Sequence, residues 1–185
     1  LILPSDRRHS NATARRVSRL KLRCPASLIR RLQAGMADRA LDTKAILLAS
    51  FEVLLHRFSG QDEVTVLAVI PADDCPCPAF GHIAVAPVRI DFAEDPDFAS
   101  VAQQAATAIR DHAADTRLQT SPGEKFPAAF IYHGREGKMP SFALDDSEHL
   151  PNSTDLVDAD LTLIVHERPD GLQMGFDYAQ DLFSS

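Results

Sequence analysis

Histidine is the side chain best suited to acid–base chemistry near neutral pH, and the chain contains seven histidines. They are His9, His56, His82, His112, His133, His149 and His166. His56 and His112 are expected at the C-terminal ends of helices, and His166 at the end of a strand, facing solvent. His133 follows a strand-like segment and is the histidine we single out for mutation. Because an isolated histidine without an orienting partner is weak evidence of catalysis, we assign no catalytic residue.

Two groups of side chains are of types that bind metal ions. Cys75-Pro76-Cys77, with His82 further along, supplies three ligands, whereas a structural zinc site normally needs four at wider spacing. Asp145, Asp146 and Glu148 lie close together but lack the spacing of an EF-hand calcium loop. Plain loop thiols and a solvated acidic loop are the better interpretations. We therefore expect no metal site.

Motifs for covalent or phosphate chemistry are missing from the sequence. It contains no Gly-x-Ser-x-Gly nucleophile elbow, and its eight scattered glycines form neither a Walker loop nor a dinucleotide-binding fingerprint. A Ser/His/Asp triad assembled by the fold is left open by residue counts alone. We expect no cofactor.

Charge is distributed unevenly along the chain. Residues 1–39 hold ten Arg or Lys against Asp6 and Asp38, a balance of +8, which leaves −15 for the remainder of a chain with net charge −7. This basic segment has no aromatic residue for base stacking, and the acidic remainder would repel phosphates. We therefore expect no nucleic acid as a partner, and interpret the segment as a solvated basic edge or one that lies against an acidic neighbour.

Composition indicates one globular domain, with 185 residues of which 45% are apolar and 24% charged. No apolar run approaches the roughly 18 residues of a membrane span, and the first residues do not form a signal peptide. They read as a segment cut from something longer. The three cysteines have no disulfide-framework spacing, which favours reduced thiols and a cytoplasmic location without membrane contact.

The first half of the chain has clear helix signals. Alternation at residues 19–23 predicts a half-buried strand, after which Pro25 opens a helix with apolar residues every four positions. A stronger helix follows, with Asp42 and Thr43 as N-cap candidates and Gly60 as its C-terminal stop. Its predicted apolar stripe is Leu47, Phe51, Leu54, Leu55 and Phe58.

Strands and one more helix are expected beyond it. Residues 64–70, apolar on both faces, predict a buried central strand, and residues 88–92 a strand with one wet face. Pro87 argues for a sheet edge or bulge there, because proline cannot donate to a ladder. The sequence Asp-Pro-Asp at 95–97 starts a helix with proline in its first turn. Its predicted buried stripe is Phe98, Val101, Ala102, Ala105 and Ile109.

The last third predicts a strand, a long loop and a hairpin. Residues 126–132 are strand-like, and residues 134–158 form a polar excursion long enough to suggest a role. Residues 161–165 and 172–178 flank an Asp-Gly pair that favours a tight antiparallel hairpin. The expected fold is therefore a mixed β-sheet with three main helices packed on it, of class α/β or α+β.

Three groups of residues carry a family resemblance. Residues 51–66 read Phe-Glu-Val-Leu-Leu-His-Arg-Phe-Ser-Gly-Gln-Asp-Glu-Val-Thr-Val, and residues 95–98 read Asp-Pro-Asp-Phe. The last group joins Ala-Asp-Leu-Thr-Leu at 159–163 and Asp-Gly-Leu at 170–172 to Asp-Tyr-Ala-Gln-Asp-Leu-Phe at 177–183. In order and spacing they resemble the C-terminal lobe of the condensation domains of nonribosomal peptide synthetases. The resemblance implies one lobe of a chloramphenicol acetyltransferase-like fold over residues 17–185. Residues 1–16 lack apolar periodicity, which predicts a linker or edge arm.

Other motifs of the family are missing or altered. The family's His-His-x-x-x-Asp-Gly belongs to its N-terminal lobe, and this chain contains no His-His pair. The family's Gly-x-Phe-Val-Asn-Thr stretch is replaced by Gly-His-Ile-Ala-Val-Ala-Pro at residues 81–87, and its His-Gln-Asp-x-Pro-Phe-Glu by Ala-Asp-Thr-Arg-Leu at 114–118. Such losses are typical of a lobe that does not catalyse by itself.

The resemblance leads to ranked functional hypotheses. The first is a truncated condensation-domain lobe, non-catalytic alone, that serves in antibiotic and secondary-metabolite assembly as a structural platform. Its implied partner is an adenylation domain directly after Ser185, with a carrier protein bearing a phosphopantetheine arm as a further candidate. The alternative is the acceptor-side half of an intact condensation domain, which forms amide bonds between carrier-bound thioesters once an N-terminal lobe supplies the histidine motif. A free-standing binding protein ranks third.

Overall fold

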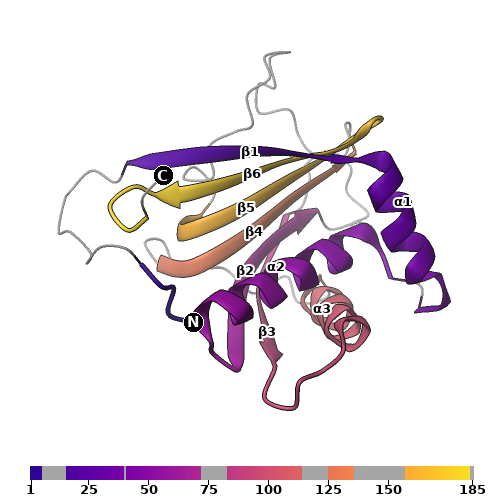
Figure 1. The fold of residues 1–185 in the computed structure, drawn as a ribbon, viewed down its shortest axis with the longest axis horizontal. Helices are drawn as coiled ribbons and strands as arrows, with labels where there is room; N and C mark the ends of the chain where they lie inside the picture. The colour runs from indigo at the N-terminus through magenta and orange to yellow at the C-terminus, as the bar shows by residue number, and fades with distance from the viewer. Residues whose placement is uncertain (6–15, 40, 72–82, 114–124, 136–156, 184–185) are drawn as a thin grey trace.

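The computed structural model describes residues 1–5, 16–39, 41–71, 83–113, 125–135 and 157–183. These residues form a six-stranded sheet in the order β1-β6-β5-β4-β2-β3, with three helices packed beside it (Figure 1). The strands are β1 (Val17–Pro25), β2 (Glu63–Pro71), β3 (Ile83–Asp91), β4 (Lys125–Arg135), β5 (Asp158–Arg168) and β6 (Gly171–Ala179). The helices are α1 (Ala26–Gly35), α2 (Thr43–Ser59) and α3 (Phe98–Ala113), with a short 3-10 turn, η1 (Ala37–Arg39). The predicted mixed sheet with three main helices is confirmed.

The sheet contains both parallel and antiparallel strand pairs. β4 runs parallel to both β2 and β5, whereas the pairs β2–β3, β5–β6 and β1–β6 are antiparallel. The predicted hairpin is present, since Arg168 pairs with Gly171 across a two-residue connection. Pro87 lies on β3, which is an edge strand as its proline predicted, although β3 begins at Ile83 rather than near residue 88.

Helix α2 confirms its predicted ends but not all of its predicted stripe. The Asp42 side chain accepts a hydrogen bond from the Ala45 amide, and Gly60 ends the helix in the left-handed conformation, with φ of 66°. Leu54 and Phe58 were expected in the core but are exposed, Phe58 by 72%. The apolar arc of the helix is wider than the surface that the sheet and α3 cover, so these two side chains lie beyond it.

Helix α3 begins slightly later than predicted. The Asp97 side chain accepts a hydrogen bond from the Ser100 amide at 2.7 Å, which makes Asp97 the capping residue and Phe98 the first helical one. Pro96 therefore precedes the cap instead of lying in the first turn. The predicted stripe is confirmed, because Val101, Ala102, Ala105 and Ile109 are buried and Phe98 packs against the same cluster.

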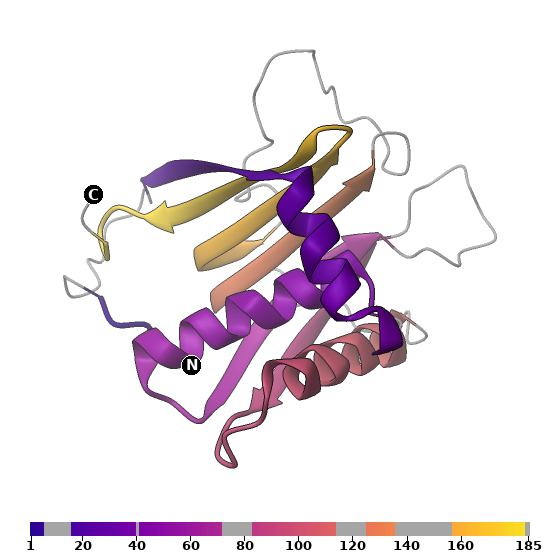
Figure 2. The same cartoon turned by 45° about the vertical axis from the view of Figure 1, so that its right-hand side comes forward.

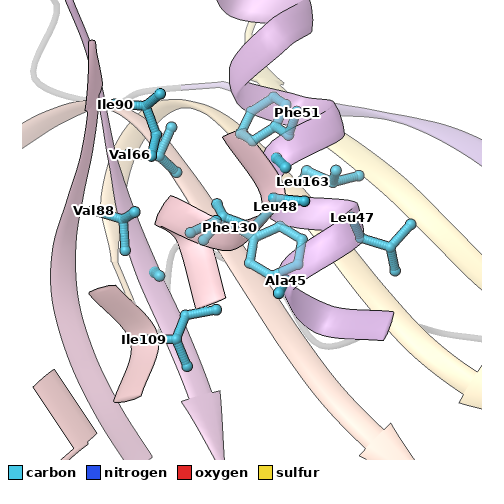
Figure 3. Packing of buried hydrophobic residues seen from close by; sticks show 14 of the residues in the cluster. Ala45, Leu47, Leu48, Phe51, Val66, Val88, Ile90, Ile109, Phe130 and Leu163 are labelled. Carbon is cyan, nitrogen blue, oxygen red and sulfur yellow. The ribbon is translucent and has the colours of Figure 1, made fainter. Parts of the chain in front are cut away.

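The two faces of the sheet differ in what covers them. Helices α2 and α3 lie over one face (Figure 2), where their apolar residues meet those of the strands. Phe51 and Leu48 of α2 point toward Phe130 of β4 and Val66 of β2 (Figure 3). None of the helices in the described residues covers the other face, which for this reason we call the helix-free face. A second apolar cluster there consists of Leu67, Val69, Ala129, Ile131, Val157 and Ile164. Alternation along each strand assigns every neighbouring side chain to one face or the other.

Candidate functional site

Polar side chains cross the helix-free face in rows set by the strand register. One row runs through Leu67, Ala129, Thr162, Asp177 and Arg19, on β2, β4, β5, β6 and β1. Thr162 and Asp177 are 1% and 3% exposed, so the row is buried where it turns polar. A buried polar row on a sheet face is unusual enough to be the first place to look for function.

Arg19 and Asp177 form the strongest polar contact of this row. The Arg19 Nε donates to Asp177 Oδ1 at 2.5 Å, and Arg19 Nη2 donates to Asp177 Oδ2 at 2.6 Å. The two parallel bonds make a bidentate guanidinium–carboxylate pair between residues directly opposite each other on β1 and β6. Both charges are satisfied by each other, so this pair anchors the edge strand and is not poised to transfer protons.

His133 and His166 meet on the same face. Their rings stack with centroids 4.1 Å apart and planes 16° from parallel, on the neighbouring parallel strands β4 and β5. The expectation that His166 faces solvent is wrong, since it is 7% exposed. Its depth follows from β5 lying inside the sheet, between β4 and β6. His133, treated as isolated from sequence, has this second imidazole as its neighbour.

Burial sets the protonation of this pair. It lowers the pKa of His133 from its usual 6.5 to about 4. Burial, then the charge of His133 and then that of Arg19 lower the pKa of His166 to about 3. Both imidazoles are therefore neutral at pH 7. A general acid or base works best with a pKa near the operating pH, so the pair is poorly tuned for proton transfer.

Glu52 is a second buried titratable group, which sequence reasoning missed. It lies on α2 with 0% of its surface exposed, and neither carboxyl oxygen has a hydrogen-bond partner among the described residues. Burial raises its pKa well above the usual value, so the neutral acid is the favoured form. The only sequence signal was a lone acidic residue inside an apolar helical stretch.

The remaining predicted residues have structural roles or lie outside the described part of the chain. His56 Nδ1 lies 2.8 Å from the Gln61 carbonyl oxygen, and its ring stacks on Phe92, as expected for a residue at a helix end. His112 lies in the last turn of α3. Outside the described residues lie His9, His82, His149, Cys75, Cys77, Asp145, Asp146 and Glu148, so their predictions stay untested.

Cys24, potential metal-binding groups and potential membrane spans are the remaining features to consider. Cys24 is a free thiol that packs against the core under the helices, and burial raises its pKa. Within the described ranges, no group of three or more His, Cys, Asp or Glu side chains could hold a metal ion. The helices of those ranges are all too short or too polar to cross a lipid bilayer.

Several apolar side chains remain exposed on the helix-covered side of the sheet. Leu20 and Leu22 of β1 are 55% and 40% exposed, and Leu54 and Phe58 of α2 are exposed as well. We call these four residues the apolar patch. Single exposed apolar residues are ordinary, but four on the same side of the sheet offer apolar surface that a partner could cover.

Comparisons with known proteins bear on these features. No family model matches the chain. A stretch of 66 residues, which is 36% of this chain, is 41% identical to phosphinothricin tripeptide synthetase PhsB of Streptomyces viridochromogenes. The matched stretch covers 6% of that synthetase.

Solved structures match nearly the whole chain. A four-domain nonribosomal peptide synthetase, holo-AB3403 bound to AMP and glycine, matches with a TM-score of 0.77 and 18% identity, over 99% of this chain and 16% of that one. The X-domain from teicoplanin biosynthesis matches with a TM-score of 0.71 and 23% identity, over 99% of this chain and 46% of that one. The condensation domain of the monacolin K polyketide synthase MokA has a TM-score of 0.69 and 16% identity, over 100% and 48%.

The chain thus spans less than half the length of each of these three solved structures. The fold expected from the resemblance is confirmed, since six strands and three helices align with condensation and X-domains over almost every residue. The chain has the condensation-domain-like fold of the nonribosomal peptide synthetases.

Proposed function

We propose that this chain is the C-terminal lobe of a condensation-domain-like unit in a peptide synthetase. In this proposal it forms no peptide bond by itself, and it serves as a platform for an adjoining adenylation domain and a carrier protein during the cytoplasmic assembly of an antibiotic peptide. The local similarity to a tripeptide synthetase and the X-domain neighbour from teicoplanin biosynthesis support this setting.

The observation that carries the non-catalytic part is the state of the buried titratable groups. Burial keeps the imidazoles of His133 and His166 neutral and favours the neutral acid of Glu52. Amine attack on a thioester needs a group that exchanges a proton near neutral pH, and the two imidazoles, with pKa values of about 4 and about 3, are poorly suited to this. They are better suited to holding the lobe together than to chemistry.

The apolar patch supports the platform part of the proposal. Exposed apolar side chains on β1 and α2 lose contact with water when a neighbouring domain covers them, which favours docking by about 25 cal/mol per Å². Two structural neighbours fit such a role: one is a four-domain synthetase, and another is an X-domain solved in complex with OxyB. A stable interface of this kind buries at least about 1,000 Å².

The platform is tested on a polypeptide that joins this chain to the adenylation domain expected after it. Small-angle X-ray scattering should give one rigid particle, and Phe58→Glu, which adds a charge to the patch, should loosen it. Thr65→Glu on β2, outside the patch, is the matched control and should leave the scattering curve unchanged. Two freely tumbling halves in the unmodified protein refute the proposal.

The rival proposal is the acceptor-side half of an intact condensation domain. The buried polar row of Thr162, Asp177 and Arg19 favours it, because a sheet face that only needed to fold could have been apolar. Purified N-terminal lobe and loaded carrier proteins are added to this chain, and the products are analysed by mass spectrometry. An amide product supports the rival, and its absence supports the non-catalytic platform.

A further inference from the structure

Strand β1 forms one edge of the sheet along its whole length. It pairs with β6 in unbroken antiparallel register from Val17 to Pro25, and it is the terminal strand in the sheet order (Figure 1). In the part of the chain that the structure describes, no strand pairs with its outer side. An edge of this length presents a row of backbone donors and acceptors that another strand can use.

Two backbone hydrogen bonds fix which β1 residues face outward. The Gln180 amide donates to the Arg16 carbonyl oxygen at 2.9 Å, and the Ala26 amide donates to the Asp170 carbonyl oxygen at 3.2 Å. Both bonds involve even-numbered residues of the β1 segment, and bonded pairs alternate with non-bonded pairs in an antiparallel ladder. The amides and carbonyls of Arg19, Lys21 and Arg23 therefore point away from β6. Pro25 occupies the next such position, where a missing amide costs no ladder bond.

The side chains of β1 separate into a basic face and an apolar face. Arg19 is engaged by Asp177, but Lys21 and Arg23 are exposed and form no ion pair within the described residues. Together with Leu22 and with Gln173 of β6 they line a hollow of about 140 Å³. Leu20 and Leu22 point to the opposite face, where they are 55% and 40% exposed.

These charges argue against a second copy of the chain as the occupant. An antiparallel β1–β1 pair would set basic side chains against basic side chains on one face, and like charges directly across a ladder are destabilising. Charged residues on an edge strand also deter aggregation, but a purely protective edge has no use for two exposed leucines on its other face. The pattern calls for a partner strand that is acidic on one face and apolar on the other.

We propose that the outer edge of β1 accepts an extended, acidic segment of a partner protein by strand addition. The backbone of Lys21 and Arg23 supplies the hydrogen bonds, alternate carboxylates of the segment lie beside the side chains of Lys21 and Arg23, and its apolar residues lie beside Leu20 and Leu22. This inference goes beyond the platform function, since it concerns the backbone edge of β1, although its apolar contacts use Leu20 and Leu22, two of the four residues of the apolar patch.

Binding is measured with three fluorescein-labelled nine-residue peptides and the 185-residue chain. The first alternates Glu and Val, the second alternates Lys and Val, and the third has the composition of the first with Glu and Val in blocks. Fluorescence anisotropy should show binding of the first peptide at least ten-fold tighter than of the other two. The double variant Lys21→Glu/Arg23→Glu should reverse the preference toward the lysine peptide. Equal binding of the alternating and block peptides, or no binding, overturns the proposal.

A pair of variants separates the backbone from the charge. Arg23→Ala removes the charge and keeps the outward amide, whereas Arg23→Pro removes both and leaves the β6 ladder intact. Arg23→Pro should bind about five-fold more weakly than Arg23→Ala, the loss expected for one net backbone hydrogen bond. Equal affinities contradict strand addition.

Amide hydrogen exchange on the unmodified chain decides the matter even if Arg23→Pro does not fold. The Lys21 and Arg23 amides should exchange rapidly in the free protein and at least ten-fold more slowly with the alternating Glu–Val peptide. Those of Leu20 and Leu22, already bonded to β6, should change little. Unchanged exchange at Lys21 and Arg23 under saturating peptide refutes the proposal. Because no adenylation domain is present, this outcome says nothing against the platform function.

Discussion

Acidification should destabilise this lobe through its stacked histidine pair. The pKa of each imidazole is lower in the folded chain than the usual 6.5, to about 4 for His133 and about 3 for His166. Between these values and 6.5 the unfolded chain binds more protons than the folded one, so stability is fully present above about pH 6.5 and is lost as the pH falls. Arg19, Lys21 and Arg23 of β1 and Asp177 of β6 are charged groups on the same face, and Arg23 lies in the same row as His166 through Gln173.

The magnitude follows from the two pKa values. A fall from 6.5 to about 4 corresponds to about 3 kcal/mol for His133 alone, at 1.36 kcal/mol for each factor of ten. With both histidines contributing, the free energy of unfolding should fall by up to about 2.7 kcal/mol per pH unit between pH 6 and pH 4. Because a domain of this size has about 5–15 kcal/mol of stability in total, the pair can unfold it in mildly acidic solution.

Urea unfolding followed by circular dichroism at half-unit steps from pH 7.5 to pH 4 measures this slope. The double variant His133→Gln/His166→Gln should flatten it, since neither glutamine titrates. His56→Gln is the control for the replacement of a histidine, because His56 lies at a helix end and is not part of the stacked pair. A double variant as steep as the unmodified chain refutes the reasoning, and other acidic groups must then cause the loss.

Three further predictions follow from buried or strained residues. Glu52→Met should stabilise the chain by about 1–3 kcal/mol at pH 8, because the pKa of Glu52 is raised in the folded chain and stability is lost as the pH rises through that pKa. Urea unfolding should show a smaller gain in stability at pH 5 than at pH 8. An equal gain at both pH values argues against this cause. Asp177→Asn should lower the free energy of unfolding by about 3–5 kcal/mol, because it removes the carboxylate that pairs with the largely buried Arg19. Glu63→Gln, which breaks the exposed Arg89–Glu63 pair, should lower it by at most about 1 kcal/mol. Similar losses for the two variants in urea unfolding would show that burial does not cause the difference. Gly171→Ala should lower the melting temperature, because φ is 146° and an added Cβ would lie 2.3 Å from the Cys24 carbonyl oxygen; an unchanged calorimetric melting curve contradicts this geometry.

Local signals in the sequence predicted the elements well. Asp42 and Gly60 define the ends of α2, and the Asp-Gly pair defines the β5–β6 hairpin, because capping and turn chemistry depend on a few adjacent residues. The apolar periods of α3 and β2 predicted their buried faces for the same reason. The fold class, a mixed sheet with helices packed on it, follows from these elements because their apolar faces must be buried in one common core.

The burial of the site residues was harder to predict, because it depends on side chains that are distant in the sequence and adjacent in the fold. His166 ends an apolar run and was expected in solvent, but β4 and β6 flank it and bring His133 against its ring. Leu54 and Phe58 have the right period for the core, yet no described element covers them. Glu52 contradicts the ordinary rule that carboxylates lie outside, so only its neighbours in three dimensions could show that it is buried.

The Arg19–Asp177 pair links these observations to the edge of the sheet. The two residues are 158 positions apart, so the pairing of β1 with β6 closes a loop that contains most of the chain. A shift of the register by two residues would place Arg19 opposite Gly175 or Ala179, neither of which offers a carboxylate, and would leave Asp177 buried without its cation. The pair therefore favours one alignment of β1 over its slipped alternatives. A two-residue slip would keep the amides of Lys21 and Arg23 pointing outward and Leu20 and Leu22 on the opposite face, so the pair sets the position of this edge along β6 and not its orientation. The buried ion pair thus determines which residues of β6 lie opposite Lys21 and Arg23.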